Sequence, residues 1–141
     1  MRSRERSREK ERGAAAVEFA LVFPMVIMLL ITVIEFSRLW NIQATLSDSA
    51  RIAARTAAIL SNDPTLDDAE IEAAATAEAT GIPSFVDWSA VTFDIDTDCD
   101  TSGGVATSVV SVAPGSVTTW FTSALGSPIT LTGNGEMPCG G

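Results

Sequence analysis

The chain has 141 residues, a formal net charge of −9 and 46% hydrophobic residues, which is enough for one small domain beside a hydrophobic segment. It has no histidine and no tyrosine, so the commonest general base and the commonest transition-metal ligand are missing. An acidic bulk argues against nucleic acid as a partner, because binding phosphates needs clustered lysine and arginine. We therefore expect no enzymatic activity, no cofactor and no bound nucleic acid.

The first residues are basic although the chain as a whole is acidic. Six basic residues precede Gly13 against three glutamates, whereas three arginines oppose the remaining fifteen acids after it. An RNA-binding arginine tract is the alternative interpretation of RSRERSREKER, but its net charge is modest and it adjoins an apolar segment. We interpret residues 1–13 as a basic leader that stays in the cytoplasm.

The apolar segment is long enough to cross a membrane. From Ala14 to Ile34 the only ionisable residue is Glu18, and at 1.5 Å per residue the stretch covers about 30 Å. A secretory signal would be shorter and followed by a small-x-small cleavage site, which EFSRLWNIQ lacks. A soluble core helix this apolar on all sides would be hard to bury in so small a protein. We predict a transmembrane helix over 14–38.

Two residues refine this interpretation. Trp40 lies just past the apolar run, where an interfacial aromatic anchor is expected. Pro24 is tolerated in a membrane helix and predicts a mild kink. The basic leader places the N-terminus in the cytoplasm and the remainder of the chain outside it.

The helical pattern continues beyond the membrane. In RLWNIQATLSDSARIAARTAAIL, apolar residues recur at helical spacings, and Asp48 can reach Arg51 one turn later. We therefore predict one helix from about Ala14 to Leu60, roughly 70 Å long, in which 39–60 is an amphipathic continuation. The apolar positions of this continuation are Leu39, Ile42, Leu46, Ala53, Ala57 and Leu60.

Residues 61–141 are predicted to form an extracytoplasmic domain. SNDP, residues 61–64, ends the long helix, and Thr65 with Asp68 resembles a capping box before a short acidic helix over 66–80. The segments VTFDID, VATSVVSVA and PITLTGNGEM then have the composition of strands. A small antiparallel sheet of three or four strands should pack on the amphipathic helix, because so few strands alone are marginal. The predicted fold class is α+β.

Four aspartates at alternate positions, 94, 96, 98 and 100, suggest a calcium loop. An EF-hand loop starting at Asp94 needs glycine at its sixth position and glutamate at its twelfth, where this chain has Cys99 and Val105. The alternative is a strand end whose acidic side chains all face water. We expect no metal site, with Asp94, Asp96 and Asp98 as the candidate ligands if one exists.

Cys99 and Cys139 are the only cysteines, and they cannot build a zinc site without further ligands. Both lie in the part predicted to be outside the cytoplasm, where disulfides persist. A bond between them would close a loop of about 40 residues and stabilise the domain by about 4 kcal/mol in the chain-entropy model. Two free thiols are the alternative.

Gly13 and Glu18 form the most distinctive pair in the sequence. In the simplest interpretation Gly13 is a joint and Glu18 a tolerated polar residue, but ionisable residues inside membranes usually have a function. A basic leader ending in glycine, then AAAVEFALVFP with Glu18 and Phe19 fifth and sixth after it, resembles the cleavage motif of type IV prepilins. The TadE-like pseudopilins of tight-adherence (Flp) pilus systems are the most similar group. The similarity continues through LSDSARIAARTAAIL and extends to SPITLTGNGEMPC.

This resemblance implies that a membrane aspartic prepilin peptidase cuts between Gly13 and Ala14, with Glu18 and Phe19 serving recognition and assembly. The implied partners are the peptidase, other pilin and pseudopilin subunits, the inner-membrane assembly platform and membrane lipid. The implied location is the cytoplasmic (inner) membrane in a single pass, and then the extracellular pilus. Major Flp pilins are much shorter, so the added globular part implies a minor subunit with a pilin-like fold that serves adhesion or secretion.

Two other functions stay open. Pseudopilins of type II secretion share the glycine and the glutamate, but usually lack the alanine–arginine continuation. A single-pass membrane anchor that displays an unprocessed binding module is the alternative from a different class. A membrane-bound enzyme would need a nucleophile and base, which this sequence does not offer.

Overall fold

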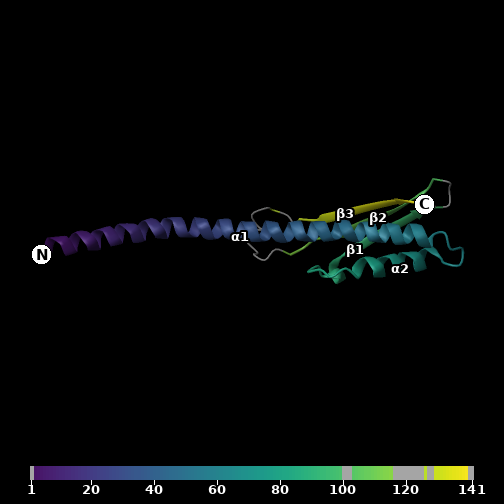
Figure 1. Cartoon of the computed structure of the whole chain (residues 1–141), viewed down its shortest axis with the longest axis horizontal. Helices are drawn as coiled ribbons and strands as arrows, with labels where there is room; N and C mark the ends of the chain where they lie inside the picture. The colour runs from purple at the N-terminus through teal and green to yellow at the C-terminus, as the bar shows by residue number, and fades with distance from the viewer. Residues whose placement is uncertain (1, 100–102, 116–125, 127–128, 140–141) are drawn as a thin grey trace. The chain divides into compact units, whose positions relative to one another are not determined.

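A computed structural model describes residues 2–99, 103–115, 126 and 129–139. The elements follow one another as α1 (Arg2–Leu60), α2 (Asp68–Thr80), the short 3-10 helix η1 (Trp88–Ala90), β1 (Thr92–Asp98), β2 (Val105–Val112) and β3 (Leu131–Pro138) (Figure 1). A long N-terminal helix and a small antiparallel sheet confirm the predicted α+β class. The chain divides into two compact units, Met1–Ser37 (unit 1) and Arg38–Gly141 (unit 2).

Unit 1 consists of the first part of α1. The helix begins at Arg2 and not at Ala14 as predicted, because the leader is made largely of arginine, glutamate and lysine, which favour helices. The helix continues through Pro24, and every side chain over 15–30 is exposed. In the described chain, one helical stretch, Ala15–Leu60, is long and apolar enough to cross a membrane. Its exposed apolar surface suits contact with lipid.

In unit 2, α1 has one buried face, which confirms the predicted amphipathic continuation. Small side chains dominate this face, while Arg51 and Arg55 are exposed on the opposite side. The predicted pair of Asp48 and Arg51 is present with 3.9 Å between carboxylate oxygen and guanidinium nitrogen. Because both side chains are exposed, the pair adds at most about 1 kcal/mol. The buried residues of this face are Ile42, Leu46, Ala50, Ala53, Ala54, Ala57 and Ala58.

The N-terminus of α2 differs from the prediction. Asp67, not Thr65, is the N-cap: the Glu70 backbone N–H donates to the Asp67 carboxylate (2.8 Å) and the Asp67 N–H donates to Glu70 Oε2 (3.2 Å). Thr65 donates both its N–H and its hydroxyl to Asp63 Oδ1, so it is already engaged in the preceding turn. The capping box is therefore completed by a glutamate, whose side chain reaches back to the N-cap.

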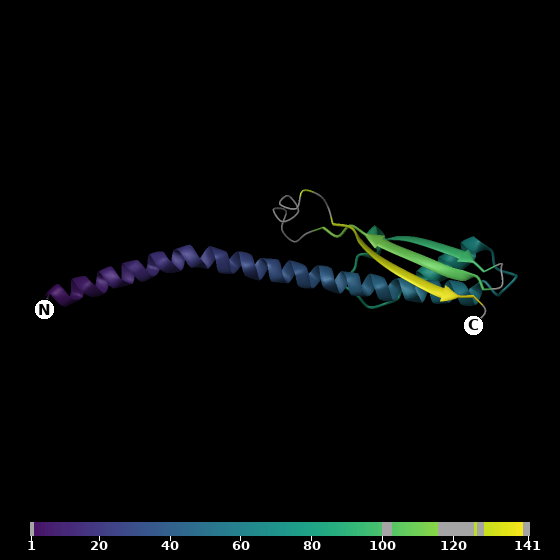
Figure 2. The same ribbon diagram turned by 90° about the horizontal axis from the view of Figure 1, so that it is seen from above.

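The sheet has the order β1-β2-β3 with antiparallel neighbours, and both helices cover one of its faces (Figures 1 and 2). Two apolar clusters fill the space between the sheet and the helices. In the first, alanines of α1 and α2 meet Ile71 and Ala106. In the second, Ile42 and Leu46 of α1 meet Val110 and Val112 of β2. Alternate residues of each strand point into these clusters, as expected for a sheet with one covered face.

The backbone of β3 lies directly against α1. A Cβ atom at Gly133 would overlap the backbone carbonyl of Leu46, and one at Gly135 would overlap the carbonyl of Ala50. Both glycines are buried. The Gln43 side-chain amide also donates to the Thr132 carbonyl at 2.9 Å. The two glycines therefore set the distance between the sheet and the helix, since a side chain at either position would push them apart.

We predict that Gly135→Ala lowers the free energy of unfolding of unit 2 by about 1–3 kcal/mol, because the added methyl group overpacks a contact between two backbones. Thermal or denaturant unfolding of the full chain in micelles, followed by circular dichroism, measures the loss. Asn134→Ala is the matched control, since this neighbouring side chain is exposed and its removal should change stability by less than about 0.5 kcal/mol. Equal stability of the two variants would contradict the role given to Gly135.

Candidate functional site

Gly13 lies on α1, is exposed, and has open space where a side chain would be. Apart from its chain neighbours and the backbone of its own helix, no described atom lies within 4 Å of the position of a Cβ at residue 13. Glycine inside a helix is less favourable than alanine by roughly 0.5–1 kcal/mol. The fold of this chain therefore gains nothing from glycine at position 13. The reason for this residue is sought in what approaches it from outside.

The other predicted site residues lie on the same stretch of helix. Gly13, Ala14, Glu18 and Phe19 fall within about two turns of α1. Ala14 and Glu18 are four positions apart, which places them one turn apart on one face. Glu18 is exposed, and the Phe19 side chain is 65% exposed with its ring centroid 5.3 Å from that of Phe23. Both side chains are accessible to a partner.

The candidate calcium ligands do not form a cluster. Asp94, Asp96 and Asp98 alternate along β1 and are all exposed, while the fourth aspartate, Asp100, lies outside the described residues. Among the residues that the structure describes, no group of three histidine, cysteine, aspartate or glutamate side chains could hold a metal ion. The alternative interpretation, a strand whose acidic side chains face water, describes these three residues.

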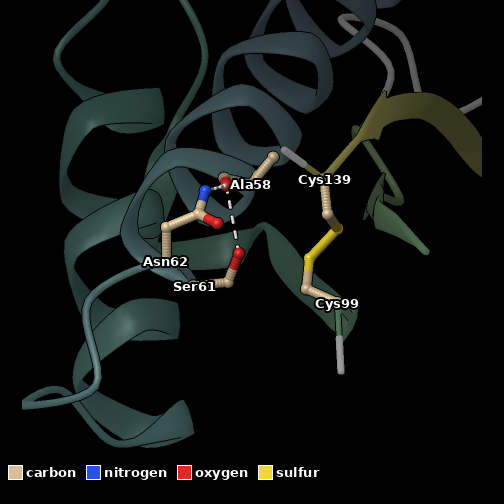
Figure 3. The surroundings of a disulfide bond; sticks show 5 residues. All are labelled: Ala58, Ser61, Asn62, Cys99 and Cys139. Atoms are coloured by element: carbon tan, nitrogen blue, oxygen red, sulfur yellow. Dashed lines mark hydrogen bonds between the residues drawn. A yellow bond between two sulfur atoms is a disulfide. The ribbon is translucent and has the colours of Figure 1, made fainter. Parts of the chain in front are cut away.

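Cys99 and Cys139 lie together at one end of the sheet (Figure 3). Cys99 follows β1 and Cys139 follows β3; their Cα atoms are 5.4 Å apart and a disulfide joins them. Gly104 lies between the two strand ends, where its carbonyl accepts from the Cys139 N–H at 2.9 Å. A Cβ at Gly104 would overlap the Asp98 carbonyl, so glycine here lets the strand ends converge.

The end of α1 is close to this bond (Figure 3). The Ser61 hydroxyl and the Asn62 side-chain amide both donate to the Ala58 carbonyl, at 3.0 and 3.1 Å. These bonds satisfy a carbonyl of the last turn that has no partner within the helix. Cys99 and Cys139 are half-buried and pack against the cluster that contains Ala57 and Ala58. The disulfide therefore closes the core where α1 ends.

Two residues were missed by sequence reasoning. Glu35, which directly follows the apolar run in the sequence, is buried and only 1% exposed. Phe85, in the connection between α2 and η1, is 98% exposed. A single aromatic residue in a loop belongs to no periodic pattern, so the sequence held no signal for its exposure.

Residues 13–55 match the model of a protein family described as TadE-like protein. The match confirms the resemblance predicted from Gly13, Glu18 and the alanine–arginine segment. The match covers less than half of the chain, and a TadE-like family suggests a protein associated with tight-adherence (Flp) pili. No curated protein and no solved structure matches the chain.

We predict that the protein isolated without reductant has no thiol that reacts with an alkylating agent. The free energy of unfolding of the Cys99→Ser/Cys139→Ser variant should be lower by about 2–5 kcal/mol, because the loop of 40 residues is no longer closed in the unfolded chain. Mass spectrometry after alkylation and denaturant unfolding measure the two effects. Two alkylated cysteines in native, unreduced protein would contradict the pairing.

Proposed function

We propose that this chain is a minor pseudopilin of a Flp-type pilus, cut after Gly13 by a prepilin peptidase and assembled through its N-terminal helix. It would enter the filament or help to start it, for adhesion or secretion. The observation that carries the proposal is Gly13 itself: an exposed glycine for which the described fold shows no need, directly before the exposed apolar stretch of α1. This glycine begins the segment that matches the TadE-like family.

The charge of the leader supports processing at this point. Six basic residues precede Gly13, and such residues hold the N-terminal side of a membrane helix in the cytoplasm. A peptidase must approach the backbone closely at the scissile bond, and glycine allows that approach. Cleavage would remove the cations that hold the helix in its orientation and leave Ala14 with a free α-amino group.

Glu18 supports assembly. An α-amino group has an unperturbed pKa near 8, so the new terminus would be largely cationic at neutral pH. In a stack of like subunits, the Glu18 carboxylate of one chain can face the Ala14 ammonium of the next, which offsets a burial cost of a few kcal/mol for each charge. A subunit out of register would leave its charge unpaired. The pair would then set the stagger of the helices as well as their attraction.

The same residues could pair within one chain, since Ala14 and Glu18 are one turn apart. In that case Glu18 would only reduce the cost of the monomer in lipid. The exposure of Glu18 and Phe19 on one accessible helix and the family match favour the pairing between chains. The proposed partners are therefore the peptidase, other pilin and pseudopilin subunits, the inner-membrane assembly platform and lipid.

We predict that Gly13→Leu blocks processing without disturbing the chain, because a Cβ at this position meets no described atom beyond its own stretch of helix. In cells with a working peptidase, the wild-type chain should begin at Ala14 and the variant should keep its leader, as measured by mass spectrometry of membrane-extracted protein. Ala20→Leu is the matched control, since residue 20 is an exposed alanine of the same helix, and it should be cleaved normally. Full-length wild-type protein in such cells would instead support the unprocessed membrane-anchored binding module.

We predict that Glu18→Ala is still cleaved and still inserted in the membrane but is absent from sheared pili, because the α-amino group of a neighbouring subunit loses its partner. Glu18→Asp keeps the charge on a shorter side chain and should retain part of the incorporation. Immunoblots of sheared filaments and of membranes measure both variants. Efficient incorporation of Glu18→Ala would show that the carboxylate does not act in assembly.

A further inference from the structure

The exposed aromatic side chains that the structure describes in unit 2 occur at one of its ends. Among its described residues, Trp40 is 68% exposed and Phe85 is 98% exposed. The other large apolar side chains with substantial exposure are aliphatic: Ile59, Val105 and Val109. Single exposed apolar residues are normal on a protein surface. Two large aromatic side chains at the same end, one of them fully exposed, require a specific explanation.

The chain around Phe85 is held in place on both sides. Val86 and Trp88 pack against the cluster of Ile42 and Leu46, and the Trp88 ring lies 6.3 Å from that of Phe93. The Ser84 hydroxyl accepts from the Val86 N–H at 3.4 Å. These contacts fix the loop over 84–88, while the Phe85 side chain is 98% exposed among the described residues of unit 2. Phe85 therefore contributes no burial to folding.

This loop lies at the end of unit 2 that holds the unit's first residues. Unit 2 begins at Arg38, and Ile42, one turn later, belongs to the cluster that supports the loop. The Arg38 guanidinium also donates to the Gly115 carbonyl, which brings the chain beyond β2 to the same end. In Figures 1 and 2 the segment that follows α2 lies beside this part of α1.

We infer that Phe85 and Trp40 form a lipid-contacting surface of unit 2. Aromatic residues are favoured at the boundary between headgroups and acyl chains. Trp40 is the third residue of unit 2, and the chain that leads into it is the helix proposed to span the membrane. The inference rests on that spanning helix and on neither cleavage nor assembly.

The charges next to Phe85 limit the depth of insertion. Asp87 is fully exposed, and two hydrogen bonds donated by Ser89 lower the pKa of its carboxyl group. The bond from the Ser89 hydroxyl has the larger effect, and the bond from the Ser89 N–H has the smaller one. An ionised carboxylate two residues from the ring keeps the loop at the surface. The chain as a whole carries a net charge of −9, so anionic lipid should repel it. The lipid that fits this surface is zwitterionic, held by apolar contact.

A second copy of the chain is the competing occupant. A stable interface between proteins buries about 800 Å² on each partner, whereas the exposed aromatic surface consists of two side chains. A bilayer accepts single aromatic side chains without a complementary surface. Lipid is therefore the occupant that the size of the surface favours.

The test uses the uncleaved full chain with Phe85→Cys. Because Cys99 and Cys139 form the disulfide, the new thiol is the only one and takes an environment-sensitive fluorophore. The chain is reconstituted in phosphatidylcholine vesicles, with a quencher attached to the lipid or with iodide in the water. Ile59→Cys with the same fluorophore is the matched control, since Ile59 is 60% exposed and adjoins the end of α1.

The probe at 85 should show a blue-shifted emission, quenching by the lipid-attached group and loss of quenching by iodide, while the probe at 59 behaves as in water. Equal iodide quenching at both positions would overturn the inference. Protection of the probe at 85 from iodide that appears only when the protein-to-lipid ratio is raised would show that a second copy of the chain covers the surface, and would overturn the inference. Protection that appears only with anionic lipid would show that charge and not apolar contact holds the surface on the membrane, and would also overturn it. If the chain resists alkaline extraction from vesicles and the probe at 85 stays in water, the span holds and the inference fails.

Discussion

The close contact between β3 and α1 is the constraint on which unit 2 depends. A three-stranded sheet cannot bury a core by itself, so the helix must supply the other half. Gly133 and Gly135 bring the strand backbone against the carbonyls of Leu46 and Ala50, and alanines continue the same face of α1 as far as Ala58. Small residues on both sides allow dense packing over a short distance. The alanine-rich segment of α1 is thereby explained as the surface on which the sheet lies.

Glycines of this chain separate into two kinds. At 133 and 135 a side chain would meet backbone atoms, so the fold itself demands glycine. At 13 a Cβ would meet no described atom beyond its own stretch of helix, and glycine weakens the helix. A residue that costs stability and serves no internal contact points to an external partner. This distinction, and not the glycine alone, is what supports the proposed cleavage at position 13.

The spacing of apolar residues and the positions of proline and glycine predicted most of the fold. The buried stripe at Ile42 and Leu46, the three strands and the end of α1 before Pro64 follow from local patterns. The helix α1 begins at Arg2 and not at the predicted Ala14. The charged residues of the leader indicate membrane orientation, but they also favour helix formation. The cap of α2 was misplaced because Thr65 is engaged by Asp63, a competition that spacing does not reveal. The close approach at Gly135 and the exposure of Phe85 depend on tertiary contacts, so no local pattern could show them.

The two ends of unit 2 are stabilised by different means, and the difference follows from how α1 passes through them. At one end α1 continues without a break, so Ile42 and Leu46 are held by helix on both sides while the β1 start and the β2 end pack on them. At the other end α1 stops at Leu60, and Cys99 and Cys139 pack against the cluster that α1 and α2 form there. The bond between Cys99 and Cys139 lies at this second end. A covalent link therefore joins the ends of β1 and β3 at the point where α1 no longer continues.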